Sequence, residues 1–184
     1  MGVLADTART RLQQAAVDLF GERGFDSTTA AEIAARAGVT ERTFFRHFAD
    51  KREVLFDGQA VLLEALLAAI DDIPPDAPPL GTLFRAFRSV CPLLDANRPF
   101  SEPRQAVISA TPALQERELA KTAALAAALA QALRARGVPD DRAAFAAQIG
   151  MAVFAHVTVD WLEKSEPGLT DRLDRAEQDL KTLL

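Results

Sequence analysis

The segment 28–48 constrains the fold of this chain more than any other stretch of its 184 residues. Thr29 and Glu32, three residues apart, form the capping-box pattern with which many helices begin. Gly38 predicts the end of this helix, because a residue without a Cβ adopts the left-handed backbone conformation at the lowest cost. Thr40 is a suitable N-cap for a second helix. We therefore expect two short helices joined by a tight glycine turn.

The second of these helices has one apolar face. Phe44 and Phe48 are one turn apart, so both side chains point toward the core. The polar side chains left near an exposed face are Glu41, Arg42, Thr43, Arg46 and His47. A short helix with outward cations fits the major groove of double-stranded DNA. The segment thus predicts a DNA-binding helix-turn-helix.

The net charge of −5 does not by itself favour nucleic acid as a partner. Residues 1–57 carry 8 Lys or Arg and 9 Asp or Glu, so this segment is not basic as a whole. Between residues 40 and 52, however, four cations face two carboxylates and leave a local charge of +2. This small patch predicts weak non-specific DNA binding by one copy and stronger binding by two copies side by side.

Composition favours an all-helical protein. The chain is 49% hydrophobic and 26% charged, as in ordinary soluble globular proteins. Tyrosine is absent, β-branched runs are scarce, and Ala and Leu are abundant. The single cysteine, Cys91, excludes an internal disulfide and fits a reducing compartment. No export-signal pattern and no 18-residue apolar run occur, so we expect a cytoplasmic protein with no membrane partner.

Hydrophobic periodicity predicts a series of helices with one stiff interruption. An amphipathic helix is expected over residues 6–23. Asp50 and Glu53 repeat the capping box and begin a long helix to about Ile70. Four prolines within 74–79 then form a rigid connector. Further helices are expected at about 80–94, 101–110, 112–136, 140–163 and 168–183.

These elements predict two domains. Residues 1–50 would form the DNA-binding domain, and residues 51–184 a helical domain connected to it by the helix that starts at residue 51. Within the second domain, the segment 140–163 is apolar on almost every side and carries small residues such as Ala147 and Gly150. A helix of this kind is buried, either in a core or in a subunit interface.

The N-terminal segment resembles the DNA-binding domain of the TetR family of transcriptional regulators. The similarity covers about the first 57 residues and rests on Leu19-Phe20, Gly24-Phe25, Thr28-Thr29, Ile33-Ala34, Ala37-Gly38-Val39, Thr43-Phe44-Phe45-Arg46-His47-Phe48 and Lys51. The following helices resemble the family in architecture only. The resemblance implies a homodimeric repressor with a small-molecule pocket in its second domain. It also implies that the last two helices of each subunit pack against those of the partner.

The resemblance assigns roles to individual DNA-facing residues. Arg42 and Thr43 stand where members of the family reach bases or nearby phosphates. The family's phosphate-contacting positions are occupied here by Thr29, His47 and Lys51. Phe45 stands where the family most often has a tyrosine whose hydroxyl binds a phosphate, so one such contact is absent. The full expected set is Thr28, Thr29, Thr40, Glu41, Arg42, Thr43, Phe45, Arg46, His47 and Lys51.

The second domain offers weaker signals. Residues that could line a ligand pocket, although each also fits an ordinary core, are Phe84, Phe87, Cys91, Arg104, Gln148, Met151, Phe154, His156 and Trp161. The expected dimer contacts are Ala147, Gly150, Phe154, Leu169, Leu173, Ala176 and Leu180. We expect the effector to be small and apolar.

The alternatives to an effector-controlled regulator are an enzyme and a DNA-binding protein without an effector. An enzyme is not expected, because one cysteine, two distant histidines and no glycine-rich loop offer no defensible catalytic set, metal site or cofactor site. A dimeric DNA-binding protein without an effector remains open, since the region 140–183 would support dimerisation equally well in both cases.

Overall fold

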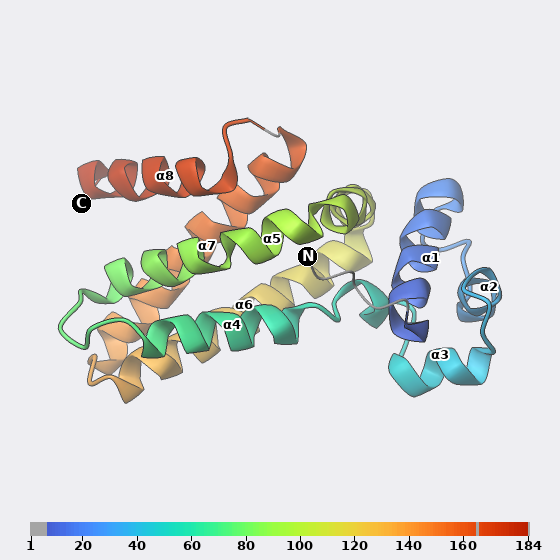
Figure 1. Ribbon diagram of the computed structural model, residues 1–184, viewed down its shortest axis with the longest axis horizontal. Coiled ribbons are helices and arrows are strands. Elements are labelled where there is room, and N and C mark those ends of the chain that lie inside the picture. Colours follow the sequence, from blue (N-terminus) through green and yellow to red (C-terminus); the bar gives the residue numbers. More distant parts are fainter. Residues whose placement is uncertain (1–6, 165, 184) are drawn as a thin grey trace. The chain divides into compact units, whose positions relative to one another are not determined.

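The computed structural model describes residues 7–164 and 166–183, and within these ranges the chain forms α-helices and one short 3-10 helix without β-strands (Figure 1). In chain order the elements are α1 (Ala8–Arg23), α2 (Ala30–Arg36), α3 (Glu41–His47), η1 (Glu53–Leu55), α4 (Gln59–Asp71), α5 (Pro79–Ser109), α6 (Pro112–Ala135), α7 (Asp140–Glu163) and α8 (Leu169–Leu183). The all-α prediction is confirmed. Residue 6, where the first helix was expected to begin, lies outside the described residues.

The helices form two compact units. The first contains the described residues up to Gly58 together with Pro99–Glu118. The second contains Gln59–Arg98 and the described residues from Leu119 onward. Residues 51–58 and 99–118 therefore belong with the DNA-binding segment rather than with the second domain to which the sequence assigned them. As a consequence, α5 and α6 each contribute residues to both units.

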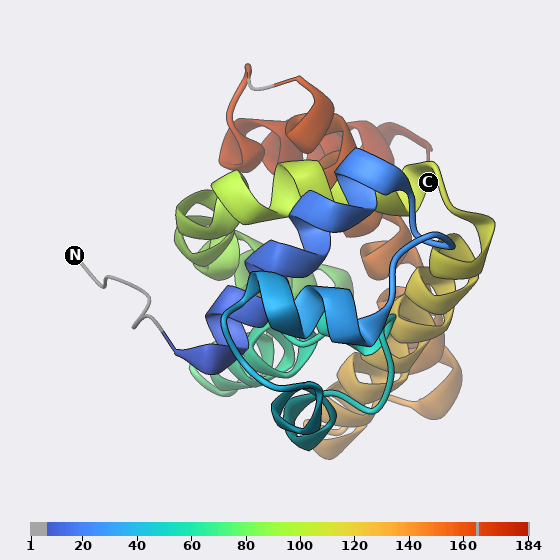
Figure 2. The same ribbon diagram turned by 90° about the vertical axis from the view of Figure 1, so that its right-hand side faces the viewer.

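In the first unit, α1 packs against α2 and η1, and α2 packs against α3 (Figure 2). Gly24 ends α1 with a φ of +84°, and its N–H donates to the carbonyl of Phe20. The chain then folds back, so that the rings of Phe20 and Phe25 lie 5.1 Å apart. The core also includes side chains from the distant segment, namely Val107, Ile108 and Leu114.

The long helix expected from Asp50 onward is interrupted. The Asp50 carboxylate accepts hydrogen bonds from the backbone N–H groups of Arg52 and Glu53 at 2.7 and 3.1 Å, which is the Asp50 half of the predicted capping box. Only the 3-10 turn η1 follows, and α4 starts separately. The three consecutive residues 54–56 are all buried in one core.

The two helices expected at 80–94 and 101–110 form one helix, α5. It continues through Pro92, Pro99 and Pro103. Each proline lacks a backbone N–H and removes one helical hydrogen bond, but none of them ends the helix. Pro99 is the first residue of α5 that belongs to the first unit.

The core of the second unit is built around α7, which packs against α8. Nine residues of α7 are buried, from Ala143 to Leu162. This burial accounts for the apolar residues on the inner side of this helix, whereas Phe145 and Ile149 are exposed on its outer side. Among the described helices, α7 alone is long and apolar enough to cross a membrane, a criterion that buried core helices also meet.

Candidate nucleic-acid interface

The helix-turn-helix is held by the caps that the sequence predicted. Thr29 Oγ1 accepts the backbone N–H of Glu32 at 3.2 Å, and the Thr29 N–H donates to the Glu32 carboxylate at 2.9 Å. Gly38 has a φ of +68°, which a residue without a Cβ adopts most easily. Thr40 Oγ1 caps α3 by accepting the N–H of Thr43 at 3.2 Å. These contacts define where α3 begins and how the turn presents it.

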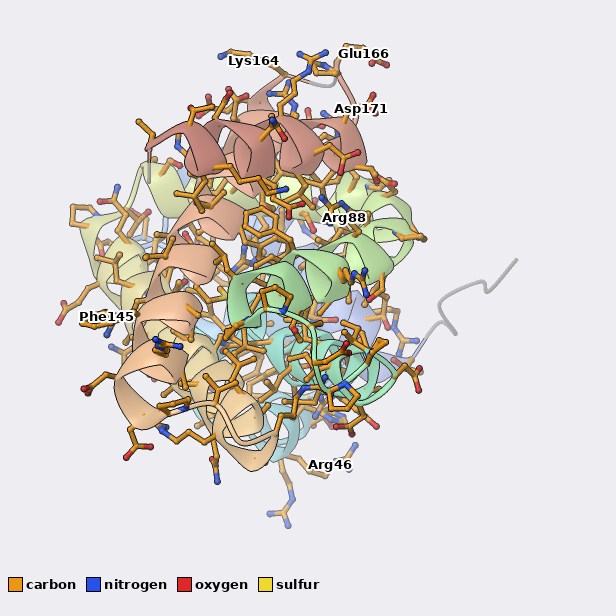
Figure 3. All side chains as sticks on the ribbon, turned by 90° about the vertical axis from the view of Figure 1, so that its left-hand side faces the viewer. Arg46, Arg88, Phe145, Lys164, Glu166 and Asp171 are labelled. Carbon is orange, nitrogen blue, oxygen red and sulfur yellow. The ribbon has the colours of Figure 1, made fainter. Side chains whose placement is uncertain are left out.

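The two sides of α3 differ sharply. Phe44 and Phe48 are buried, with ring centroids 5.6 Å apart. On the opposite side, Arg42 and Arg46 are exposed, and the Arg46 side chain extends away from the ribbon (Figure 3). Phe45 flanks these arginines and is 53% exposed. The outward face of α3 therefore combines two cations with one apolar ring, and the exposed carboxylate of Glu41 lies one turn before that ring.

Most cations of the first unit are neutralised by neighbouring carboxylates. These ion pairs include Arg9–Asp57, Arg23–Glu32, Arg36–Glu22, Arg52–Asp50, Arg104–Glu118 and Arg117–Glu53. The hydrogen bond from Arg36 lowers the pKa of the Glu22 carboxyl below its ordinary value. By contrast, the guanidinium groups of Arg42 and Arg46 have no ion pair or hydrogen bond with any residue in the described ranges. The free positive charge of this unit is thus concentrated on α3.

Besides Thr29 and Thr40, two further residues of the expected DNA set have internal partners. Lys51 Nζ donates to the carbonyl oxygens of Phe25 and Thr28 at 2.8 and 3.0 Å and lies 4.2 Å from the Phe25 ring centroid. The Thr28 side chain is buried, and its hydroxyl donates to the carbonyl of Gly24 at 2.9 Å. Both residues stabilise the loop between α1 and α2. His47 is half-buried, and its Nε2 is enclosed without a hydrogen-bond partner among the described residues.

Most of the expected pocket residues fill the core of the second unit. The buried members of the set are Phe84, Phe87, Cys91, Met151, Phe154 and Trp161. The rings of Phe87 and Phe154 stack with centroids 4.4 Å apart. Gln148 and His156 are exposed on α7. These side chains therefore contribute to packing or to the surface, and none of them lines the groove described below.

Arg104 belongs to the first unit and not to a pocket in the second. Its Nε donates to the carbonyl oxygen of Leu55 at 2.5 Å, and its Nη2 donates to the Glu118 carboxylate at 3.3 Å. Its guanidinium carbon lies 5.1 Å from the Phe56 ring centroid. Burial lowers the pKa of Arg104, and the Glu118 carboxylate partly compensates for this effect. This side chain fastens the segment 99–118 to η1.

The groove on the second unit was missed by sequence reasoning. It has a volume of about 680 Å³ and lies between the α4–α5 connector, the start of α5 and α8. Its lining residues are Pro74, Asp76, Ala77, Pro78, Leu80, Gly81, Arg85, Arg88, Glu177, Leu180 and Lys181. Arg136 shapes one wall, because its guanidinium donates to the carbonyl oxygens of Ile70, Ile73 and Pro74. The run of prolines was the only sequence signal at this place.

Charged side chains cross the groove. Arg88 on α5, which is labelled in Figure 3, forms ion pairs with Asp174, at 2.6 Å, and with Glu177 on α8. Burial is the largest single influence on Glu177 and favours its neutral form, but the hydrogen bonds and positive charges of Arg88 and Lys181 together outweigh it and lower the pKa of this carboxyl. Arg85 is exposed and has no ion pair within the described part of the chain. One cation therefore remains available at the groove.

Cys91 is buried, and burial raises the pKa of its thiol. Its Sγ lies 3.4 Å from the carbonyl oxygen of Phe87. Over residues 7–164 and 166–183, no three His, Cys, Asp or Glu side chains are placed to hold a metal ion.

The expected dimer contacts lie inside a single chain. Ala147, Phe154, Leu169 and Leu173 are each at most 4% exposed. Gly150 is also enclosed, since a Cβ there would meet Leu83 at 3.0 Å. Only two members of the set, Ala176 and Leu180, are partly exposed. The exposed apolar side chains of α7 are instead Phe145, at 64%, and Ile149, at 37%. Phe145 points away from the helix bundle (Figure 3).

Comparison with known proteins supports the assignment of the N-terminal segment. Residues 12–57 match the family described as bacterial regulatory proteins, tetR family. The HTH-type transcriptional regulator TcmR of Streptomyces glaucescens is 42% identical over 82 residues, which cover 45% of this chain and 36% of that protein. The HTH-type transcriptional repressor Rv3405c of Mycobacterium tuberculosis is 37% identical over 106 residues, which cover 47% of this chain and 56% of that protein.

A solved structure extends the similarity in fold beyond the N-terminal segment. FadR of Thermus thermophilus, a TetR family transcriptional repressor in complex with lauroyl-CoA, has a TM-score of 0.58 and 24% identity, and the match covers 92% of this chain and 91% of that chain. In sequence, by contrast, the matches span from 36% to 56% of the length of the two curated relatives.

Proposed function

We propose that this chain is a member of the TetR family of bacterial transcriptional regulators and that it is a homodimeric repressor, which binds a pseudo-palindromic DNA operator in the cytoplasm. The observation that carries the proposal is the outward face of α3, where Arg42 and Arg46 are exposed and unpaired among the described residues. Neighbouring cations already have carboxylate partners. Arginines in this position can bind phosphates or the edges of guanines.

Dimerisation follows from the small charge on α3. Two cations per copy give weak DNA binding, whereas two linked reading helices add their contacts. We place the interface on the outward side of α7, where exposed side chains recur every three or four residues at Phe145, Ile149, Ala152 and His156. This stripe replaces the expected contacts that are buried inside one chain.

The groove on the second unit is the proposed effector site. Its volume of about 680 Å³ lies in the range of small-molecule sites. Leu80 and Leu180 offer apolar surface, and Arg85 offers an unpaired cation. The fitting ligand is therefore an amphipathic molecule with an apolar body and an anionic end, rather than a purely apolar one. Lauroyl-CoA, which is bound in the Thermus thermophilus FadR structure, has this chemistry and is the first ligand to test.

Effector binding would have to change DNA affinity through the chain itself. The helix α5 begins at the groove and ends with residues of the first unit. A ligand that binds more tightly to one arrangement of α5 increases the population of that arrangement, and with it the population of the corresponding state of the DNA-binding unit. The required coupling is a difference in ligand affinity between the DNA-bound and DNA-free states.

The test is selection of operator fragments from random DNA, followed by binding measurements with variants. Arg42→Ala should weaken binding to the selected operator by roughly 1–3 kcal/mol and relax base preference at one position. Arg175→Ala, which removes an exposed arginine from α8, is the matched control and should bind normally. Unchanged affinity and preference in the Arg42 variant would contradict this placement of the reading helix.

The packed core of the second unit favours a second candidate, a dimeric DNA-binding protein without an effector. Measurements with lauroyl-CoA distinguish this candidate from the effector-controlled repressor. In the effector-controlled case lauroyl-CoA raises the melting temperature and releases the operator, and Arg85→Ala weakens both effects. If a broader set of amphipathic anions also leaves melting and DNA binding unchanged, the second candidate is the better description.

A further inference from the structure

Phe45 is an exposed aromatic side chain on the proposed reading helix. It is 53% exposed on the outward side of α3, whereas its neighbour Phe44 is fully buried. The two rings meet edge to face, with centroids 5.3 Å apart and an interplanar angle of 83°. This contact holds the Phe45 ring in place. Its exposed half lies three residues from Arg42 and next to Arg46, the two unpaired arginines of α3.

The chemistry of the ring restricts what it can contact on DNA. Phe45 has no hydrogen-bonding atom, so it cannot bind a phosphate or the polar edge of a base. Its only gain on binding is the removal of apolar surface from water. Among the groups that the four base pairs display in the major groove, the apolar one is the C5 methyl of thymine. The arginines beside Phe45 direct this part of α3 toward that groove.

We infer that Phe45 contacts a thymine methyl group in each operator half-site and thereby determines the base preference at that position. The inference rests on the proposed DNA binding by α3. It assigns to Phe45 a reading role, in addition to the loss of the phosphate-binding hydroxyl noted from the sequence. The three outward residues then have different roles. The two arginines bind phosphates or hydrogen-bond acceptors of bases, and Phe45 contacts the apolar methyl group of thymine.

The test replaces thymine by uracil, one position at a time, in the operator that the protein selects from random DNA. This exchange removes the methyl group and leaves the base-pairing edge intact. We expect one position in each half-site at which the exchange weakens binding about fourfold, as the loss of one methyl-sized contact implies. Phe45→Ala should weaken binding to the thymine operator and lose the difference between thymine and uracil. Phe45→Tyr keeps the ring and should keep that difference.

Controls separate this inference from the proposed function. Phe45 is exposed, so its variants should retain the helical circular dichroism and melting temperature of the parent protein. Leu119→Ala, which truncates an exposed apolar side chain of the second unit, should show the parental response to uracil. If no DNA sequence is enriched, the proposed function fails and the inference with it. If an operator is found but uracil has no effect, or affects parent and Phe45→Ala equally, the inference alone is overturned.

Discussion

Replacing Phe145 by serine tests the proposed subunit interface most directly. The side chain is 64% exposed in one chain, so a partner could still bury about two thirds of it. Full burial of a phenylalanine contributes about 1.5–3 kcal/mol, which leaves roughly 1–2 kcal/mol for this contact. A two-fold interface contains the residue twice. Phe145→Ser should therefore weaken dimerisation by about 2–4 kcal/mol, or raise the dimer dissociation constant roughly 30- to 700-fold.

Sedimentation velocity over a range of protein concentrations measures this change. Leu119→Ser is the matched control, because Leu119 is 72% exposed on α6 and lies outside the proposed α7 interface. Both variants replace exposed side chains, so both should keep the parental helical circular dichroism if the chains fold alike. A dissociation constant of Phe145→Ser within threefold of the parental value would refute the α7 interface.

A charge at Gly150 cannot serve the same purpose. A Cβ at this position would approach Leu83 Cδ1 to 3.0 Å and the Phe87 ring to 3.4 Å. Gly150→Asp would add both overpacking and an unpaired buried charge to the core of one chain. Any loss of dimer in that variant would follow from damage to the fold. Phe145 is therefore the informative site on α7.

Three further predictions concern single side chains. Lys51→Ala should lower the free energy of unfolding by about 1–3 kcal/mol in urea titrations, because two carbonyl oxygens lose their donor. The same variant should leave the salt dependence of DNA binding unchanged. A slope of log affinity against log salt that is smaller by about one would show that Lys51 contacts a phosphate. Arg104→Met should cost about 1–3 kcal/mol in the same titrations, because Leu55 and Glu118 lose a donor, and parental stability would show that this clamp is dispensable. Cys91 should resist thiol reagents at pH 7 until the chain unfolds, since burial encloses the thiol and raises its pKa, and rapid labelling of the native protein would contradict this.

The parts of the fold that were predictable depend on local chemistry. Thr29, Gly38 and Thr40 specify caps and a turn through contacts within three or four residues, and the structure confirms each of them. The return of Phe25 onto Phe20 after Gly24 is likewise local. Patterns of this range are visible in a sequence because both partners lie in the same short window.

The parts that were missed depend on contacts between distant segments. The hydrogen bonds from Lys51 Nζ to carbonyl oxygens more than 20 residues away could not be inferred from its local sequence. Arg104 lies 49 residues from the Leu55 carbonyl that it binds, so its membership of the first unit could not be read locally. The apolar pattern of α7 was correctly interpreted as burial, but it could not distinguish a core from a subunit interface.

The charge of the reading face limits how this protein can bind DNA. Sequence counting gave +2 for residues 40–52, but Lys51 and Arg52 in that count have internal partners. The unpaired cations are Arg42 and Arg46, four in a dimer. If all four contacted phosphates, the slope of log affinity against log salt from them would reach only about −3.6. Counterion release from α3 is therefore small, so affinity at physiological salt has to come from joining two copies and from contacts to bases. This requirement is met by an apolar face on α7 and by an exposed ring beside the arginines on α3.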